Sequence, residues 1–296
     1  MNGIFNVLKP PGMTSFDVVA YLRGKLKIRK IGHTGTLDPG AVGVLPVCVG
    51  KATKAIEYLI DRDKAYRAEM VLGISTDTQD SMGKVLKRSD KIPAPQKIAE
   101  AIKEFVGDYS QIPPMYSAIK VGGKKLYELA RNGIEIKRDP RDVKIHFIDI
   151  LNVDGEKVIF DVGCSKGTYI RTLCADIGER LGCGGHMSFL VRMQSGEFDI
   201  KNSLTIEQIS RGIEENIISN YMVGIDRVFE EYKGISLDED NTKKFLNGGF
   251  VPVNDPRFIL SQRIRVYSYN GEFLALGNII QNKKNGFHLK SVKLFI

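Results

Sequence analysis

The sequence has few of the features that extracellular and metal-binding proteins use to hold a fold together. Its 296 residues include four cysteines, Cys48, Cys164, Cys174 and Cys183, and no two of them form a CxxC pair. Three lie within apolar patterns, which is typical of reduced, buried thiols in a cytosolic protein. Cys183 and His186 have the spacing of half a metal site, but no second pair of ligands follows. We therefore expect no zinc and no other metal.

Targeting and membrane-spanning segments are also missing. The N-terminal stretch MNGIFNVLKPPG lacks the charged start and the apolar run of a secretory signal peptide. The longest uncharged apolar run, residues 39–50, is too short to cross a bilayer. We therefore expect a soluble, cytoplasmic protein that does not contact a membrane.

The glycine-rich stretch GHTGTLDPGAVGVLPV (residues 32–47) does not match a nucleotide-binding loop. A P-loop requires GxxxxGK followed by Ser or Thr, whereas Gly50-Lys51 is followed by Ala52, and residue 45 is a leucine. The GxGxxG pattern of dinucleotide-binding folds is absent as well. The stretch holds one acidic residue, Asp38. From the residues alone, Asp38 either caps a turn with its side chain or presents a carboxylate to a ligand.

Acidic residues are fewer than basic ones. The formal net charge is +8 and the pI is about 9.1. Basic residues are concentrated in three blocks, 23–30, 120–144 and 257–296, and an acidic stretch over 201–240 separates the last two. Several basic faces suit a polyanionic partner such as nucleic acid, although a single basic block is more often a solvated surface.

Hydrophobic periodicity predicts an α+β fold with a mixed sheet rather than a doubly wound one. Helical spacing runs from a capping box at Thr14 and Asp17 through Leu22, and again over 98–106 and 170–181, where Gly107 and Gly182 are the expected stops. Alternation predicts strands over 66–72 and 158–164. Nearer the C-terminus, Asn270-Gly271 indicates a hairpin and Asn285-Gly286 a second turn. We expect a larger domain over residues 1–231 and a small β-domain over 232–296.

Five motifs together resemble those of the bacterial tRNA pseudouridine-55 synthases, which isomerise a uridine in the T loop of tRNA. GHTGTLDPGAVGVLPV resembles their catalytic loop, and LKPPGMTSFDVV (8–19) resembles their N-terminal motif. KAYRAEMVLGISTDTQD (64–80) is similar to their tyrosine-bearing strand. PPMYSAIKVGGKKLYELAR (113–131) is similar to their RNA-contacting insert, and CSKGTYIRTLCADIGERLGCGGH (164–186) to their arginine-bearing strand, turn and helix. The motifs follow the family's order.

The resemblance implies the pseudouridine synthase fold, a mixed, mostly antiparallel sheet flanked by helices, with an RNA-gripping insert at about residues 113–144. Residues 232–296 resemble a short PUA domain, an RNA-binding β-module. It further implies a monomer that modifies tRNA without a cofactor, a metal or a guide RNA. Two alternatives stay open. RNA-guided pseudouridine synthases share the GTLDP loop and a PUA domain, and an RNA-binding module that has lost its chemistry would keep the same basic blocks.

The resemblance also assigns roles to individual residues. Asp38 is the essential carboxylate, acting as a nucleophile toward the sugar or the base, or as a base that removes a sugar proton. Arg171 is expected to pair with Asp38 and to lower its pKa, and Tyr66 to stack on the target base. His33 fills the space that the flipped base leaves. Without the family, Tyr66 is equally a core aromatic and Arg171 an exposed helix residue.

Supporting residues are implied with less specific roles. Leu190 is expected to form the apolar pocket wall, with Tyr169 and Lys64 beside the site. The grip on the T loop is assigned to Lys120, Lys124, Lys125 and Arg131. Lysines within 283–293 would suit the acceptor end of the tRNA. Lys9 and Pro10 are expected to buttress the catalytic loop, and Gly32, Gly35 and Gly40 to shape its backbone.

Overall fold

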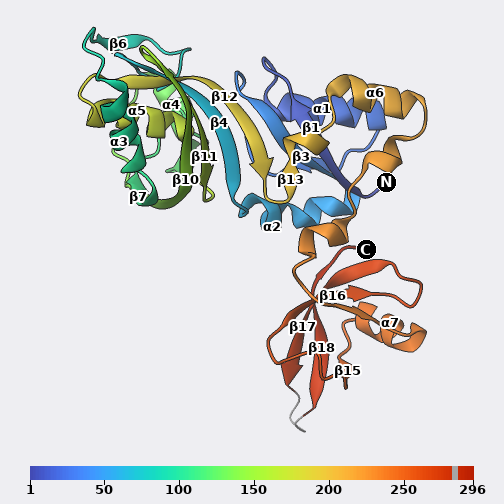
Figure 1. Cartoon of the computed structure of the whole chain (residues 1–296). Coiled ribbons are helices and arrows are strands. Elements are labelled where there is room, and N and C mark those ends of the chain that lie inside the picture. The colour runs from blue at the N-terminus through green and yellow to red at the C-terminus, as the bar shows by residue number, and fades with distance from the viewer. Residues whose placement is uncertain (282–285) are drawn as a thin grey trace.

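A mixed sheet of nine strands forms the centre of the larger part of the protein (Figure 1). The computed structural model describes residues 1–281 and 286–296. The strand order is β1-β3-β12-β4-β11-β10-β7, with β2 attached to β3 and β13 to β12. The strands are β1 (Gly3–Lys9), β2 (Ile31–His33), β3 (Val42–Val49), β4 (Lys64–Leu72), β7 (Gly107–Gln111), β10 (Arg141–Asp154), β11 (Lys157–Cys164), β12 (Gly185–Ser195) and β13 (Phe198–Asp199). Among these described strands only β12 and β3 pair in parallel.

One half of this sheet is covered by α3 (Pro95–Lys103) and α5 (Ile170–Arg180). Their apolar residues join those of β4, β10, β11 and β12 in one core that includes Met70, Phe160, Leu173 and Leu190. Two small hairpins and a helix extend from this half: β5 (Ile74–Thr76) with β6 (Val85–Arg88), and β8 (Lys120–Val121) with β9 (Lys124–Lys125), followed by α4 (Leu126–Arg131).

The other half, β1 to β3, is buried on both faces. One face carries α1 (Ser15–Leu26) and α6 (Ile206–Glu214) over Phe5, Val7 and Leu45. The opposite face, with Ile4 and Val44, is covered by η1 (Gly50–Ala55), α2 (Ile56–Ile60) and η4 (Ile225–Phe229). Two shorter 3-10 turns, η2 (Ile200–Asn202) and η3 (Ile218–Tyr221), lie between β13 and η4 in the chain. Burial on both faces explains why β3 has the nearly continuous apolar sequence VGVLPVCV.

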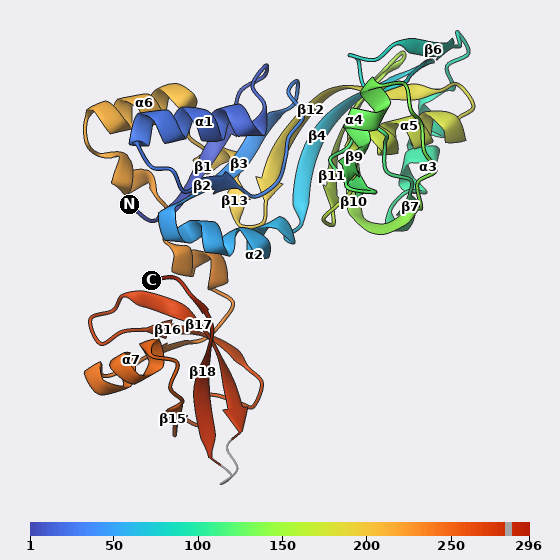
Figure 2. The same cartoon turned by 180° about the vertical axis from the view of Figure 1, so that it is seen from behind.

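A second sheet of five strands makes up the C-terminal part, in the order β14-β16-β17-β18-β15. Its elements are β14 (Gly234–Ser236), α7 (Glu239–Leu246), β15 (Val251–Val253), β16 (Arg263–Tyr267), β17 (Phe273–Gln281) and β18 (Phe287–Leu294). In both views this sheet lies below α2, at the end of the molecule that holds β1 to β3 (Figures 1 and 2). The separate C-terminal β-unit that the sequence predicts is confirmed; the boundary at residue 232 stays a prediction.

Aromatic packing joins the two sheets. Phe295 is 2% exposed and belongs to the same apolar core as Ile4 and Val44 of the larger sheet. Its ring centroid lies 5.6 Å from that of Phe229 and 5.3 Å from that of Phe273. Lys54 adds hydrogen bonds to the carbonyl oxygens of the last strand and the C-terminal residue. The end of the chain is thus packed against the first strands.

The predicted α+β class and the mostly antiparallel sheet are confirmed. The Thr14–Asp17 capping box opens α1, and Gly182, with φ +73°, follows the end of α5. The helix predicted over 98–106 begins and ends earlier, because Pro95 occupies its first turn; Gly107 starts β7 instead of ending a helix. The Asn270-Gly271 hairpin is present, whereas Asn285 lies outside the described residues. No described helix has both the length and the apolar character needed to span a membrane.

Candidate active site

The Asp38 loop connects β2 to β3 and is fixed by side chains from other parts of the chain. The Lys9 ammonium is fully buried and donates to the carbonyl oxygens of Pro10, Met13 and Pro39 at 2.8, 2.6 and 3.2 Å. The Ser15 hydroxyl accepts from the Leu37 amide at 2.8 Å. The N-terminal motif therefore buttresses the loop through its backbone.

Arg192 supports the loop from the neighbouring strand β12. It lies on β12 where this strand runs parallel to the start of β3, and it is only 2% exposed. Its Nε donates to the Val44 carbonyl at 2.6 Å and its Nη2 to the Gly35 carbonyl at 3.2 Å. None of the ion pairs among the described residues includes Arg192. Sequence reasoning missed this residue, because an arginine in an alternating strand looks like an ordinary exposed charge.

Asp38 and Arg171 form the ion pair that the sequence predicts. Arg171 Nε lies 3.0 Å from Asp38 Oδ2, and Nη2 lies 3.5 Å from Oδ1. The Arg171 side chain is 8% exposed, whereas the Asp38 side chain is 41% exposed. The pair thus consists of a buried guanidinium and a carboxylate that solvent or a ligand can reach from one side.

The same guanidinium also holds groups that the sequence did not reveal. Arg171 Nη1 lies 3.3 Å from Asp80 Oδ2 and 3.4 Å from the Thr78 carbonyl oxygen, and Nη2 donates to the Tyr116 carbonyl at 2.8 Å. Arg171 therefore links the Asp38 loop, the turn between β5 and β6, and the start of the insert. The turn stands directly after the tyrosine-bearing strand in the sequence, which was the one available signal for Asp80.

The surroundings of Asp38 shift its pKa in opposite directions. Burial raises the pKa of Asp38; Arg171 opposes this rise and Asp80 adds to it, so the net direction is upward. Pairing with Arg171 alone was expected to lower this pKa. Arg171 does lower it, as expected, but removal of water and the second carboxylate together outweigh this guanidinium. An elevated carboxylate pKa next to a cation is a mark of functional sites.

Tyr66 and Leu190 line the sheet beside this pair. Tyr66 lies on β4 opposite Arg192 of β12, and its ring packs against the core of the α3 and α5 half. Leu190 lies opposite Ala68 on the same two strands and is 7% exposed. Burial raises the pKa of Tyr66, so its phenol stays protonated at neutral pH. Tyr66 lies on the strand predicted for it, while the roles of both residues toward a base stay predictions.

Lys64 and Tyr169 lie at the ends of the elements that carry Tyr66 and Arg171. Lys64 begins β4 and donates to the Ile60 carbonyl oxygen at 2.6 Å; burial, with Arg192 nearby, lowers its pKa to about 8. The backbone of Tyr169 is held at both ends by the side chain of Gln111, at 2.8 and 3.0 Å. Tyr169 precedes α5 directly and so helps to place Arg171 two residues later.

His33 is hydrogen-bonded within the loop. Its Nδ1 accepts from the Gly35 amide at 3.3 Å. Burial and the charge of Arg192 both lower the pKa of His33, so its imidazole is neutral at pH 7. This geometry suits a hydrogen-bonded structural histidine as well as the space-filling histidine that the family resemblance implies.

The predicted loop glycines differ in what their surroundings require. Gly35 has φ +152°, and a Cβ on Gly32 would come within 2.8 Å of the Ile56 side chain. Gly40 faces open space, with no atom within 4 Å of a built Cβ. The strictest position is Gly43, which was not singled out: it has φ +117°, and its Cβ would lie 2.3 Å from the Arg192 carbonyl oxygen.

The basic residues assigned to RNA lie on the insert and the C-terminal sheet. Lys120 and Lys124 are exposed on the β8–β9 hairpin, and the side chains of Lys125 and Arg131 lie over the Tyr127 ring, at 5.3 and 5.5 Å from its centroid. In the C-terminal sheet Lys293 pairs with Glu57 at 2.6 Å, which commits it to a contact inside the chain. Lys290 is exposed and its ammonium lies 6.0 Å from the centroid of the Phe250 ring, and the remaining acceptor-end lysines, Lys283 and Lys284, lie outside the described residues.

Comparison with known proteins identifies the family. The model of the TruB family pseudouridylate synthase N-terminal domain matches residues 23–170, and that of the tRNA pseudouridylate synthase B C-terminal domain matches residues 171–228. The chain belongs to the TruB family of pseudouridylate synthases. Neither matched range reaches the five-stranded sheet. In the described part of the TruB chain, no group of three or more His, Cys, Asp or Glu side chains is placed to hold a metal ion.

Full-length relatives and solved structures agree with this family. The chain is 47% identical to tRNA pseudouridine synthase B of Alkaliphilus oremlandii, over 99% of this chain and 98% of the relative. It is 46% identical to tRNA pseudouridine synthase B of Clostridioides difficile, over the whole of both chains. Among solved structures, a chain of a Cbf5-Nop10-Gar1 complex superposes with a TM-score of 0.74 at 28% identity, covering 99% of this chain and 85% of that one.

Proposed function

We propose that this protein isomerises a uridine in the T loop of tRNA, at position 55, to pseudouridine, with Asp38 as the essential carboxylate. The observation that carries the proposal is the pair of Asp38 and Arg171: an accessible carboxylate held by a buried guanidinium, on a loop whose backbone is fixed by Lys9 and Arg192. The relatives named tRNA pseudouridine synthase B, at 46–47% identity over nearly the whole chain, support the choice of substrate.

The reaction moves one base within one nucleotide. The N1–C1′ bond of the uridine breaks, the base turns, a C5–C1′ bond forms, and the C5 proton is replaced by a proton on N1. Because no atom or electron is gained or lost overall, the balance needs neither an oxidant nor a second substrate. A water molecule at the site would instead capture the sugar and release free uracil, so exclusion of water is a requirement of this chemistry.

The residues around Asp38 have separate tasks in this proposal. Asp38 attacks the sugar or the base, or removes a sugar proton, and each of these roles needs the ionised carboxylate. Arg171 supplies the positive charge that favours ionisation against burial and the Asp80 charge. Tyr66 stacks on the flipped base, Leu190 closes the apolar wall, and His33 fills the vacated space. The exposed basic side chains on the β8–β9 hairpin and α4 bind the RNA backbone.

The experiment that tests the proposal uses unmodified tRNA. We expect the wild-type protein to convert the T-loop uridine, as mapped by pseudouridine-specific chemistry on the product. Asp38→Asn should bind the same tRNA with a similar Kd and give no product. Wild-type protein that binds tRNA without forming pseudouridine would show a binding module, and a variant with near-wild-type turnover would remove Asp38 from the chemistry.

A second candidate is a guide-dependent enzyme, which the likeness to the Cbf5-Nop10-Gar1 structure favours. The higher identity to relatives named tRNA pseudouridine synthase B favours a monomeric cytoplasmic enzyme that recognises the tRNA T arm by itself. Turnover of tRNA by the purified protein without any added RNA or protein decides between the two.

A further inference from the structure

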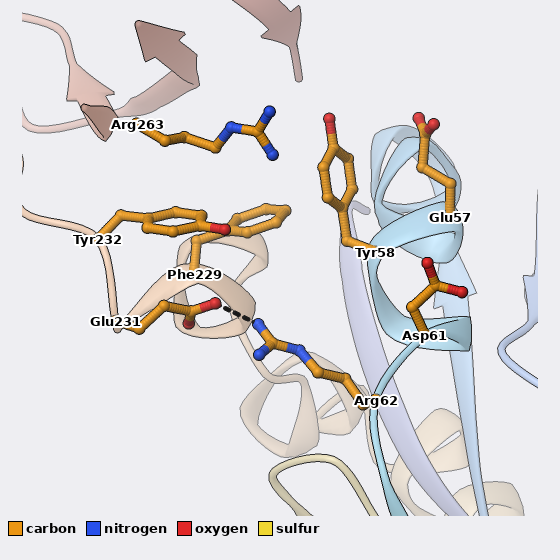
Figure 3. A pocket seen from close by; sticks show the side chains of 8 residues that line it. All are labelled: Glu57, Tyr58, Asp61, Arg62, Phe229, Glu231, Tyr232 and Arg263. Carbon is orange, nitrogen blue, oxygen red and sulfur yellow. Dashed lines mark hydrogen bonds and ion pairs between the residues drawn. The ribbon is translucent and has the colours of Figure 1, made fainter. Parts of the chain in front are cut away.

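A pocket opens between the two sheets, away from the Asp38 site (Figure 3). Its lining comes from α2 with the two residues that follow it, from η4 with the segment after it, and from β16, so the larger part of the protein and the C-terminal sheet both contribute. The residues are Glu57, Tyr58, Asp61, Arg62, Phe229, Glu231, Tyr232 and Arg263. None of them takes part in the function proposed above.

The carboxylates of this pocket are already neutralised within the chain. Glu57 pairs with Lys293 at 2.6 Å and Asp61 with Lys166 at 2.9 Å. Glu231 pairs with Arg62, as the dashed line in Figure 3 shows.

Arg263 is different from the other charged residues of the lining. Among the described residues it has no ion-pair partner and its guanidinium has no hydrogen-bond acceptor. One positive charge therefore remains uncompensated in the pocket, which favours an anionic ligand.

The walls of the pocket are aromatic. Phe229 forms the buried floor of the pocket. The Tyr58 ring is edge-on to the Phe229 ring, with 5.2 Å between the ring centroids. The Tyr232 ring is nearly parallel to it, with 6.3 Å between the centroids and 13° between the ring planes. The Arg263 guanidinium carbon lies 6.0 Å from the centroid of the Tyr58 ring. In Figure 3 Arg263 and Tyr232 reach in from one side and Tyr58 faces them from the other. The phenol rings and the guanidinium therefore offer half-buried faces against which a flat ring can lie.

We infer that this pocket binds one unstacked nucleotide, with its base against Tyr58 or Tyr232 and its phosphate on Arg263. Aromatic rings combined with an unpaired arginine are the general means by which proteins hold single-stranded bases. Where the nucleotide belongs to bound tRNA, the inference rests on the function proposed above. A free mononucleotide has the same chemistry and is the other source.

The test compares pocket variants with matched controls. Arg263→Met and Tyr58→Leu change the pocket. Arg257→Met and Tyr269→Leu remove the same groups elsewhere in the C-terminal sheet, where Arg257 is paired with Asp255 and Tyr269 is 62% exposed. Kd is measured for unmodified full-length tRNA, for an isolated T-arm hairpin and for AMP and CMP. Thermal melting of each variant identifies any that fails to fold. If Tyr58→Leu fails to fold, Arg263→Met still tests the pocket.

We expect the pocket variants to bind full-length tRNA about 5- to 100-fold more weakly than the controls, the range that loss of one base–aromatic stack gives. Arg263→Met should also lower the slope of log Kd against log salt by about 0.7, the loss of one single-strand phosphate contact. Weaker binding of the hairpin as well places the nucleotide in the T arm; an effect on AMP or CMP alone assigns the pocket to free nucleotides.

Pocket variants that bind all four ligands as the controls do would overturn the inference. That result is distinct from failure of the proposed function, because pseudouridine formation by the wild-type protein is measured on the same tRNA. Wild-type turnover together with unchanged binding would leave the enzyme assignment standing and the pocket as an ordinary gap between two packed units.

Discussion

The stability of Asp38 variants gives a sharp test of the site's electrostatics. Because the pKa of Asp38 is raised, the folded protein binds its proton more tightly than the unfolded chain does. Stability is therefore lost as the pH rises from the ordinary value of 3.8 through the folded-state pKa. Asp38→Asn removes this penalty, and its amide oxygen can still accept from Arg171.

We expect Asp38→Asn to be as stable as the wild type or up to about 1 kcal/mol more stable, because replacing a strained functional group often stabilises a protein by this order. Arg171→Met should do the reverse. It leaves Asp38 and Asp80 without their cation and the Tyr116 carbonyl oxygen without its donor. Breaking a buried pair costs about 3–5 kcal/mol, and because Asp38 is 41% exposed we expect about 2–3 kcal/mol.

The double variant Arg171→Met/Asp38→Asn isolates the interaction. With one carboxylate left instead of two, it should recover about 1 kcal/mol relative to Arg171→Met. Urea unfolding at pH 7, followed by circular dichroism, gives the free energies of unfolding. Asp161→Asn, which breaks the exposed pair with Arg67, serves as the control and should stay within about 0.5 kcal/mol of wild type. An Asp38→Asn protein that loses more than about 1 kcal/mol, or a double variant less stable than Arg171→Met, would refute this reasoning.

Three further predictions concern the same loop and its charges. Turnover should fall as the pH drops through the raised pKa of Asp38. Asp80→Asn should shift this fall in kcat to lower pH, because the Asp80 charge raises the pKa of Asp38. An unchanged pH dependence of kcat in Asp80→Asn would contradict the prediction. Arg192→Lys should lower kcat about 100-fold with little change in the Kd for tRNA, because a misplaced Asp38 loop slows the reaction by about this factor. Equal effects on kcat and Kd would indicate general unfolding. The free energy of unfolding in urea should be at least about 2 kcal/mol lower for Gly43→Ala than for Gly40→Ala, because only the substitution at Gly43 adds a steric clash and backbone strain.

Periodicity and motif spacing predicted those parts of the fold that depend on local sequence. Alternation located β4 and β11, and helical spacing located α5, because each element buries one face on the same core. The pairing of Asp38 with Arg171 also followed from the sequence, but only through the family's motifs. Nothing in the spacing of 133 residues between them indicates a contact.

The missed features depend on contacts between distant segments. Arg192 becomes a buried support only because β12 runs parallel to β3 over Val42 and Gly43. Asp80 reaches Arg171 because the turn between β5 and β6 folds back onto α5, and its charge adds to the upward shift of the Asp38 pKa. Burial and the number of neighbouring charges are properties of the assembled fold, and a single sequence does not contain them.

The Asp38 loop needs few polar residues of its own because its backbone is held by side chains from other parts of the chain. Lys9, Ser15 and Arg192 bind main-chain atoms of the loop, and their hydrogen bonds go to carbonyl oxygens and an amide instead of the Asp38 carboxylate. Among the described residues, the ion-pair partner of that carboxylate is Arg171, on its buried side. A side chain held at its backbone and at one side stays fixed in position while its other side remains open. This separation of support from chemistry explains why a single carboxylate stands in a bend of glycine, proline and apolar residues.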